Sequence, residues 1–170
     1  MNPIPKTALF CFFLLLNFST SHAAELPAID QEYANTAPGS FNLWINPGLI
    51  SYHFDRDAGY RDLNNGFGVQ SDVSDQLSLM AGNFINSDRA RSNFAGMAWQ
   101  PLSWHAIKIG LAVGILDGYL TTNNGGKFLA VLPWITIRNE RIGINLTIAP
   151  YPNDPHHLGV ISGQVILRVW

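Results

Sequence analysis

Cysteine is almost absent from this 170-residue sequence, and the single one, Cys11, lies close to the N-terminus. Around it, Lys6 supplies a positive charge, residues 8–16 form an apolar run, and Ser21 and Ala23 are small residues of the kind that precede a signal-peptidase site. We therefore expect residues 1–23 to be a signal peptide that is cleaved near Ala23. The remaining chain would contain no cysteine, which excludes disulfides and a thiol nucleophile.

Charge is also scarce, because only 13% of the residues are Asp, Glu, Lys or Arg. Ten basic and twelve acidic residues leave no basic stripe, so we expect no nucleic-acid partner. The apolar run at residues 8–16 is too short for a membrane-spanning helix, which needs about 20 residues. Residues 24–40 are polar, contain Pro27 and Pro38, and are expected to form a short N-terminal leader before a single domain at 41–170.

Short apolar segments with alternating character fill that domain. In the stretch HAIKIGLAVGIL, the large residues Ile107, Ile109 and Leu111 share one face of a strand, and small or polar residues share the other. We predict eight strands, at residues 42–54, 66–72, 76–86, 92–100, 104–116, 128–138, 141–149 and 158–170. Large apolar residues outside and small or polar residues inside are typical of an eight-stranded antiparallel outer-membrane β-barrel.

The predicted connections alternate between short and long. Short links at 73–74, 101–103 and 139–140 are typical of periplasmic turns, and the longer links at 55–65, 87–91, 117–127 and 150–157 are typical of outer loops. The five tryptophans lie near predicted strand ends, where interfacial aromatic residues are common. The final residue, Trp170, resembles the C-terminal aromatic signal of barrel proteins, although Arg168 occupies a position that is usually apolar. We therefore expect the protein in the bacterial outer membrane.

This topology places His53, at the end of the first strand, and Ser87, after the third, at the same outer rim. The segments around them, HFDRDAGYRDLNNGFG and FINSDRARSNFAGMAWQPL, resemble those of the lipid A palmitoyltransferases of the PagP type. The resemblance extends over about residues 42–170, but only these two regions are specific. It implies transfer of a palmitate-like acyl chain from a phospholipid donor to a hydroxyl of lipid A, without a cofactor.

Carried over by position, the resemblance makes His53 the general base for the attacking hydroxyl and Ser87 a residue that holds the ester or stabilises the oxyanion. The acid that precedes the serine in the family is replaced here by Asn86, which cannot stabilise an imidazolium as a carboxylate does. Either another carboxylate serves, with Asp88 ranked ahead of Asp55, or catalysis is slow or lost.

Three further residues bear on the substrate. By the same resemblance, Ala98 lies at the floor of the acyl-chain pocket, where the best-known form of the family has glycine. The added methyl group predicts a donor chain somewhat shorter than palmitate. Pro47 and Pro150 match prolines that mark openings for lipid in the barrel wall. The alternative is that they only interrupt a strand ladder, and this alternative is favoured for Pro47 more than for Pro150.

Other functions remain open at this stage. A non-enzymatic small barrel, with a structural, adhesive or small-molecule-binding role, is favoured by Asn86 and by the short leader. A lipid A deacylase would need a nearby His–Ser pair, for which Ser51 and His53 are the candidates. The adjacent His156 and His157 have no further His or Cys within range, so we predict no metal site.

Overall fold

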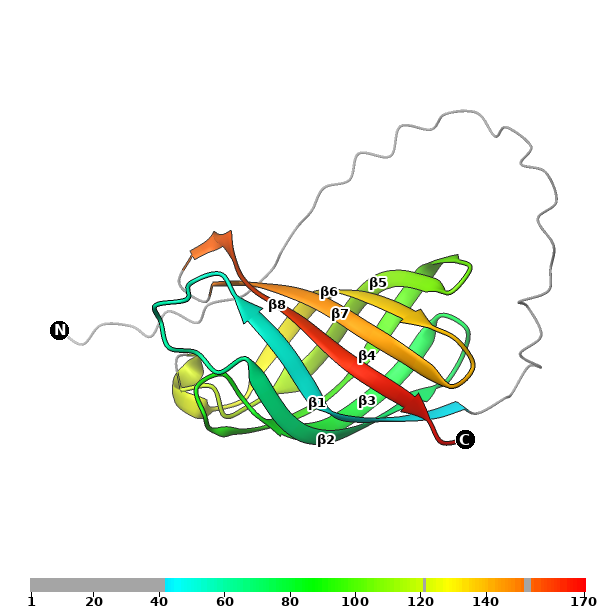
Figure 1. Cartoon of the computed structure of the whole chain (residues 1–170), viewed down its shortest axis with the longest axis horizontal. Helices are drawn as coiled ribbons and strands as arrows, with labels where there is room; N and C mark the ends of the chain where they lie inside the picture. Colours follow the sequence, from blue (N-terminus) through cyan, green and yellow to red (C-terminus); the bar gives the residue numbers. More distant parts are fainter. Residues whose placement is uncertain (1–41, 121, 152–153) are drawn as a thin grey trace, which may run out of the picture.

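The computed structural model describes residues 42–120, 122–151 and 154–170, which form a closed barrel of eight antiparallel strands (Figure 1). The predicted signal peptide, the leader and residue 41 lie outside the described residues. The strands are β1 (Asn42–His53), β2 (Leu63–Asp72), β3 (Leu77–Ile85), β4 (Arg91–Trp104), β5 (Ile107–Leu116), β6 (Phe128–Arg138), β7 (Ile142–Tyr151) and β8 (Asp154–Arg168). Each strand pairs with its neighbour in sequence, and β1 pairs with β8, which confirms the predicted fold class.

The two ends of the barrel differ in the length of their connections. At one end, short turns join β2 to β3, β4 to β5 and β6 to β7. The first residues of β1 and the C-terminus lie beside these turns (Figure 1). At the other end lie the longer β1–β2 and β5–β6 loops, the second of which contains the one-turn 3-10 helix η1 (Asn123–Gly125). We call these the turn end and the loop end. No helix in the described part of the chain is long and apolar enough to cross a membrane.

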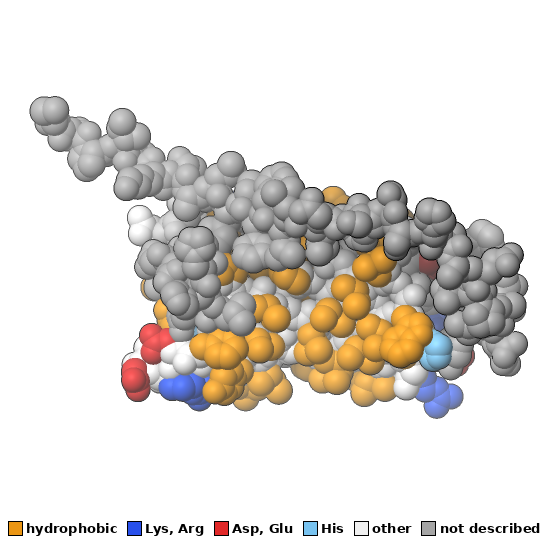
Figure 2. Space-filling model, turned by 90° about the horizontal axis from the view of Figure 1, so that it is seen from above, with side chains coloured by type: hydrophobic (Ala, Val, Ile, Leu, Met, Phe, Trp, Pro, Cys, Tyr) orange, Lys and Arg blue, Asp and Glu red, His pale blue; other side chains and the backbone are white. Residues whose placement is uncertain are grey.

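Apolar side chains cover the outside of the barrel, as the alternation predicts. On β5, Ile109, Leu111 and Ile115 are exposed while Ala112 is buried, and on β7 the exposed Ile142 and Ile144 alternate with buried Gly143 and Asn145. Figure 2 shows hydrophobic side chains spread along the flank, with charged side chains gathered towards the two ends. Exposed large apolar residues occur on all eight strands, whereas soluble monomers rarely expose contiguous apolar surface of this kind.

Hydrogen-bonded polar side chains cross the interior in the half nearer the turn end. The Asn145 amide donates to Gln70 Oε1 at 2.9 Å and to Gln164 Oε1 at 3.1 Å. The Thr136 hydroxyl lies 2.8 Å from Asn145 Oδ1 and 3.2 Å from Gln100 Oε1. These side chains come from five strands, and their mutual hydrogen bonds offset the cost of burying them.

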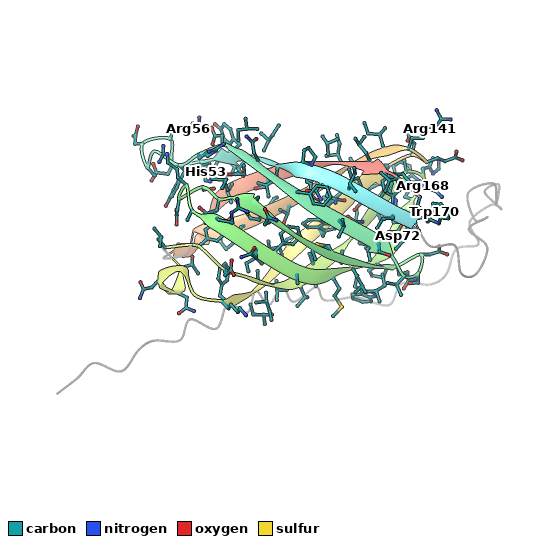
Figure 3. The ribbon with its side chains drawn as sticks, turned by 90° about the horizontal axis from the view of Figure 1, so that it is seen from below. His53, Arg56, Asp72, Arg141, Arg168 and Trp170 are labelled. Atoms are coloured by element: carbon teal, nitrogen blue, oxygen red, sulfur yellow. The ribbon has the colours of Figure 1, made fainter. Side chains whose placement is uncertain are left out.

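A buried ion pair lies beyond this polar layer, at the turn end. Arg138 Nη2 lies 3.0 Å from Asp72 Oδ2, and the same carboxylate accepts hydrogen bonds from the Trp44 indole N–H at 3.1 Å and from the Ser78 hydroxyl at 2.8 Å. The Arg138 guanidinium also lies over the Trp44 ring, 4.8 Å from its centroid. Figure 3 shows Asp72 at this end with Arg141, Arg168 and Trp170, and His53 and Arg56 at the opposite end.

Two predicted connections are wrong. The expected turn at 101–103 belongs to β4, which continues through Pro101 to Trp104; the β4–β5 register shifts there, and His105, at φ 53°, takes the turn. The expected loop at 150–157 is a short link, because the β7–β8 ladder continues to Tyr151 and Asp154. The register shifts on both sides of Pro150, which has no N–H to donate. The strand predicted at 66–72 begins earlier, at Leu63.

Candidate active site

Three side chains form a hydrogen-bonded line at the loop end. His53 is the last residue of β1, Ser87 follows β3, and Asp62 directly precedes β2. The Ser87 hydroxyl oxygen lies 2.9 Å from His53 Nε2, and Asp62 Oδ1 lies 3.0 Å from His53 Nδ1. His53 and Ser87 are buried, whereas the Asp62 side chain is 37% exposed. The arrangement is that of a serine, a histidine and a carboxylate in the order used by serine hydrolases.

The charge on Asp62 settles the direction of both hydrogen bonds. The hydrogen bond from His53, followed by that from Arg56, lowers the pKa of Asp62, so this carboxylate is ionised at neutral pH and only accepts. His53 Nδ1 must therefore carry the proton that it donates to Asp62. In a neutral imidazole, Nε2 is then free to accept from the Ser87 hydroxyl, which is the tautomer that a general base needs.

Asn86 is part of the support of this site rather than a partner of His53. Its side chain is fully buried, and its amide donates to Ser92 Oγ at 2.9 Å and to the Gly118 carbonyl at 2.8 Å. The side-chain oxygen of Asn86, Oδ1, accepts a hydrogen bond from the Ala90 backbone N–H at 3.0 Å. These bonds tie the β3–β4 loop to β4 and to the start of the β5–β6 loop, which fixes the backbone on which Ser87 lies.

The carboxylate in contact with His53 is Asp62, a residue that the sequence reasoning missed. Of the two acids proposed for this role, Asp55 accepts from the backbone N–H groups of Asp57 and Ala58 at 3.1 and 3.2 Å, so it closes a turn within its own loop. Asp88 lies near Tyr119, where burial of the phenol and then the charge of Asp88 raise the pKa of Tyr119. No signal in the sequence distinguished Asp62 from the other acids of the loop.

Ser51 does not pair with His53, although both side chains are buried on β1. The Ser51 hydroxyl lies 3.0 Å from that of Ser162 on β8, and it accepts a hydrogen bond from the Asn64 amide at 2.9 Å. The serine that contacts the histidine is therefore Ser87, from a different part of the chain.

Aromatic side chains surround the line of polar residues. The Tyr60 ring packs on the His53 imidazole, with ring centroids 4.9 Å apart. Further along the rim, Tyr119 contacts Phe84 and Phe128, with ring centroids 6.5 and 5.9 Å apart, and Phe84 in turn contacts Phe94. These rings place apolar surface between the polar residues of the rim and the interior of the barrel.

Ala98 lies deeper in the barrel, in an apolar layer above the polar side chains. It is fully buried and clusters with Ala112 and Trp134, against which Met80 packs. On β3, β4 and β5, the next inward-facing position towards the loop end is a glycine. These glycines are Gly82, Gly96 and Gly114, and they project no side chain into the interior. Ala98 thus lies between the polar side chains nearer the turn end and the glycine and aromatic residues nearer the loop end, where the Phe94 ring lies beside Gly82.

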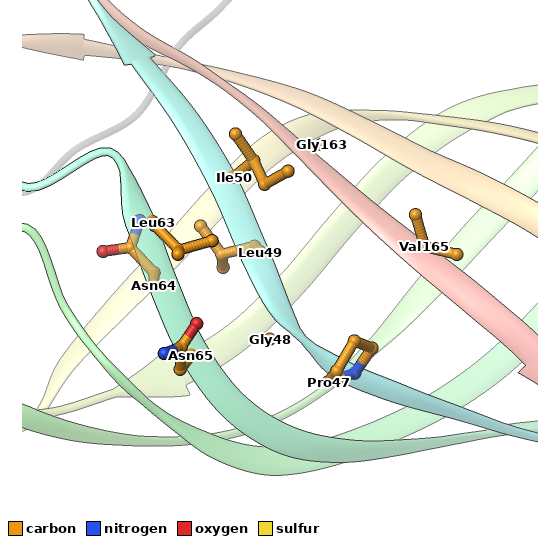
Figure 4. A pocket seen from close by; sticks show the side chains of 9 residues that line it. All are labelled: Pro47, Gly48, Leu49, Ile50, Leu63, Asn64, Asn65, Gly163 and Val165. Atoms are coloured by element: carbon orange, nitrogen blue, oxygen red, sulfur yellow. The ribbon is translucent and has the colours of Figure 1, made fainter.

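Pro47 lies where the barrel wall is irregular. The register of β1 shifts against β2 between Asn46 and Gly48, and against β8 between Ile45 and Ile50. A pocket of about 160 Å³ lies at this point, lined by Pro47, Gly48, Leu49, Ile50, Leu63, Asn64, Asn65, Gly163 and Val165 (Figure 4).

A second irregularity lies near Pro150, between β6 and β7. Their ladder runs from Arg138 and Gly143 only as far as Trp134 and Thr147, so it stops short of Pro133 and Pro150. The Thr147 hydroxyl donates instead to the Pro133 carbonyl oxygen at 2.8 Å. Of these two prolines, only Pro150 was predicted from the sequence to mark an opening in the barrel wall.

A metal-binding cluster is not present among residues 42–120, 122–151 and 154–170, where no group of three or more His, Cys, Asp or Glu side chains could hold an ion. In comparisons with known proteins, no family model matches the chain and no curated protein matches it.

Proposed function

We propose that the protein is an outer-membrane acyltransferase that moves an acyl chain from a phospholipid to a hydroxyl of lipid A. The observation that carries the proposal is the hydrogen-bonded line Ser87–His53–Asp62 at the end of a barrel with an apolar exterior. Acyl esters are the natural substrates of this arrangement, and the lipid bilayer surrounds such a barrel with acyl esters.

The exterior and the loop lengths support a membrane location. Each strand of the closed barrel pairs with both of its neighbours, and side chains such as Leu79, Leu111 and Leu129 are exposed on its outside. In outer-membrane barrels the long loops face outward, which would place the loop end and its three polar residues at the level of the outer-leaflet headgroups. The phospholipid donor and the lipid A acceptor would both be within reach there.

The first half of the reaction follows from the protonation states. Ser87 Oγ attacks the ester carbonyl carbon of the donor and gives its proton to His53 Nε2, and Asp62 stabilises the imidazolium. When the tetrahedral intermediate collapses, the bond to the glycerol oxygen breaks, and that oxygen takes the proton back from Nε2. The products are a lysophospholipid and an acyl ester on Ser87.

The second half of the reaction uses the same atoms. A hydroxyl of lipid A gives its proton to His53 Nε2 and attacks the acyl carbon, and the departing Ser87 oxygen recovers the proton. The geometry thus favours Ser87 as a nucleophile over the supporting role that the resemblance implies. The interior above Ala98, with its glycine faces, would hold the acyl chain during both steps, and no cofactor is needed.

A lipid A deacylase is the second candidate, because water in place of the acceptor hydroxyl would complete the same chemistry. The specific observation in its favour is the exposed edge of the site, where the Asp62 side chain is 37% accessible to solvent. The two functions differ only in the group that attacks the acyl ester on Ser87.

A mass spectrum of lipid A from cells that express the protein distinguishes these functions. Variants Ser87→Ala and His53→Ala remove the nucleophile and the base, and Ser103→Ala, at an exposed serine near the turn end of β4, is the matched control. An added acyl mass that is lost in both site variants but kept in Ser103→Ala identifies a transferase. A missing acyl mass with the same dependence identifies a deacylase. An unchanged spectrum, with a folded barrel in the outer membrane, refutes both and leaves a non-enzymatic barrel.

A further inference from the structure

The interior beside His53 is polar on the side formed by β1, β2 and β8. Ser51 lies two residues before His53 on the same inward face of β1, and both are buried, as is Asn64 on β2. Ser162 on β8 lies directly opposite Ser51 in the ladder that joins the two strands. We call the side chains of Ser51, Asn64 and Ser162 the polar wall. An unsubstituted acyl chain next to the candidate active site would make no hydrogen bond to it.

The hydrogen bonds within the polar wall leave one acceptor and one donor unused. The Asn64 amide donates to Ser51 Oγ at 2.9 Å and to the Asp62 carbonyl oxygen at 3.4 Å. The hydroxyl oxygens of Ser51 and Ser162 lie 3.0 Å apart, so one of their two protons lies between them and the other remains. The side-chain oxygen of Asn64, Oδ1, is buried and has no hydrogen-bond partner within the part of the chain that the structure describes.

The position of this unused acceptor sets it apart from the other buried polar atoms that lack a partner. Among the described residues, such atoms also occur on Asn42, Gln70 and Trp134. Trp134 lies in the apolar layer around Ala98, Gln70 belongs to the polar layer beyond it, and Asn42 begins β1 at the turn end. Only Asn64 lies beside the candidate active site. Since a buried acceptor without a donor is costly, its oxygen points to a partner that binds there.

The depth of the polar wall below the catalytic line indicates which atom of an acyl chain would meet it. Ser51 is two residues nearer the turn end than His53, which is a depth of about 5 Å at roughly 3.4 Å per residue and a strand tilt of about 40°. In an acyl ester on Ser87, C3 lies two bonds below the carbonyl carbon, or about 2.5 Å. A hydrogen bond of about 2.8 Å from a hydroxyl on C3 covers the remaining distance.

We propose that the polar wall binds a hydroxyl group on C3 of the acyl chain, so that this site acts on 3-hydroxyacyl esters. Such a hydroxyl donates its proton to Asn64 Oδ1 and accepts the remaining serine proton, which uses both groups that the wall leaves over. An unsubstituted chain leaves both unpaired, and a site built to bind a hydroxyl rejects the analogue that lacks it. The inference rests on the proposed function, because it starts from the acyl ester on Ser87. The same chemistry holds whether a phospholipid or lipid A supplies the acyl group.

Turnover of p-nitrophenyl esters by the full chain in detergent tests the inference. The esters of dodecanoic, 3-hydroxydodecanoic and 10-hydroxydodecanoic acid share one chain length, and their rates of cleavage by hydroxide correct for intrinsic reactivity. We expect kcat/KM for the 3-hydroxy ester to exceed that for each of the other two at least about tenfold. Asn64→Ala and Ser162→Ala should each lower this ratio to about twofold or less. A general defect of the fold lowers all three rates and leaves the ratio as it was.

Ser78→Ala is the matched control, since Ser78 is a buried serine at the turn end, where its hydroxyl contacts Asp72. Equal turnover of the three esters overturns the inference and leaves the proposed function intact. So does a preference that survives both Asn64→Ala and Ser162→Ala, or one that Ser78→Ala also abolishes; a buried water would then complete Asn64.

Binding separates this inference from the proposed function. If the protein cleaves no ester, the proposed function fails, and native mass spectrometry of Ser87→Ala with the same esters decides the inference. A tenfold preference for the 3-hydroxy ester that is lost in the double variant Ser87→Ala, Asn64→Ala supports it, and equal binding overturns it. With an active protein, release of lysophosphatidylglycerol from phosphatidylglycerol that carries a 3-hydroxydodecanoyl chain identifies a phospholipid as the source. Loss of a hydroxyacyl group from lipid A identifies lipid A, and either result supports the inference.

Discussion

The length of the transferred acyl chain is the prediction that depends most directly on the geometry of the barrel. Ser92 Oγ contacts Asn86, the neighbour of Ser87, so Ser92 marks the level of the proposed nucleophile on β4. Ala98 lies six residues further along the same strand. At roughly 3.4 Å per residue and a strand tilt of about 40°, the depth from Ser92 to Ala98 is about 16 Å. An extended alkyl chain advances about 1.25 Å per C–C bond, so this depth holds roughly 12 carbons.

Substitution of Ala98 by methionine raises the floor of this space. The longer side chain adds three heavy atoms, so we expect Ala98→Met to shorten the transferred chain by about three carbons at about 1.25 Å per bond. Ala98→Gly should lengthen the chain by about one carbon. The matched control is Ala95→Met, because Ala95 is exposed on the outer face of the same strand. The measurement is the mass of the acyl group added to lipid A.

Two results would refute this reasoning. If the wild-type protein transferred palmitate exclusively, the depth from Ser92 to Ala98 would not be the measure of the chain. If Ala98→Met, folded in the membrane, transferred the same chain as the wild type, Ala98 would not be the floor. A reduced rate without any change in length would likewise count against it, since a structural defect slows turnover without selecting a shorter donor.

Three other predictions concern residues around the site and at the opposite end. Asp62→Asn should lower turnover about 100-fold, less than the roughly 10⁴-fold of a fully buried triad aspartate, because Asp62 is 37% exposed. The pKa of Asp62 is lower in the folded protein than in the unfolded chain, so the stabilisation from ionised Asp62 is complete above about pH 4. It is lost as the pH falls through the pKa of the folded state. Below that pH, the melting temperatures of wild type and Asp62→Asn should converge. Asn86→Ala should cost about 3 kcal/mol of unfolding free energy in urea titrations in lipid vesicles, because three hydrogen bonds of a fully buried side chain are lost; an unchanged midpoint would contradict this support role. Arg138→Met should cost a similar amount, about 3 kcal/mol, because it leaves Asp72 buried without its countercharge; the chain length on lipid A should not change.

The barrel could be predicted from the sequence because one physical constraint recurs in every strand. Successive side chains along a strand point alternately to the apolar outside and to the narrow interior of the barrel. The sequence of a segment such as residues 107–116 therefore indicates both that it is a strand and which of its faces points inward. The two wrong connections both occur at prolines. Pro101 and Pro150 suggested strand ends, but each lies within a strand at a register shift, where the missing N–H removes one ladder bond without ending the pairing.

Strand direction alone places His53 and Ser87 at the same end of the barrel, since β1 and β3 both run towards the loop end, and the family resemblance suggested that the two residues act together. The contact with Asp62 could not be predicted in this way, because the eight residues between His53 and Asp62 include two other aspartates, Asp55 and Asp57. Periodicity carries no information about which of these carboxylates returns to the histidine. Arg56 and the start of β2 at Leu63, earlier than predicted, bring Asp62 back to β1.

The exchange of an acid for an amide at position 86 takes on a different meaning in this geometry. An acid at 86 would have to be desolvated, because that side chain is fully buried and its neighbours Ser92, Gly118 and Ala90 satisfy an amide, with two donors and one acceptor. Asparagine meets that pattern, and a carboxylate, which only accepts, does not. Asp62 lies instead at the solvent-exposed edge, where Arg56 balances its charge and ionisation costs little. A serine, a histidine and an acid are recognised by their contacts rather than by their order in the chain. Asn86 is therefore no evidence for lost catalysis, and a double variant makes this testable: Asn86→Asp should destabilise the barrel without restoring the turnover that Asp62→Asn removes.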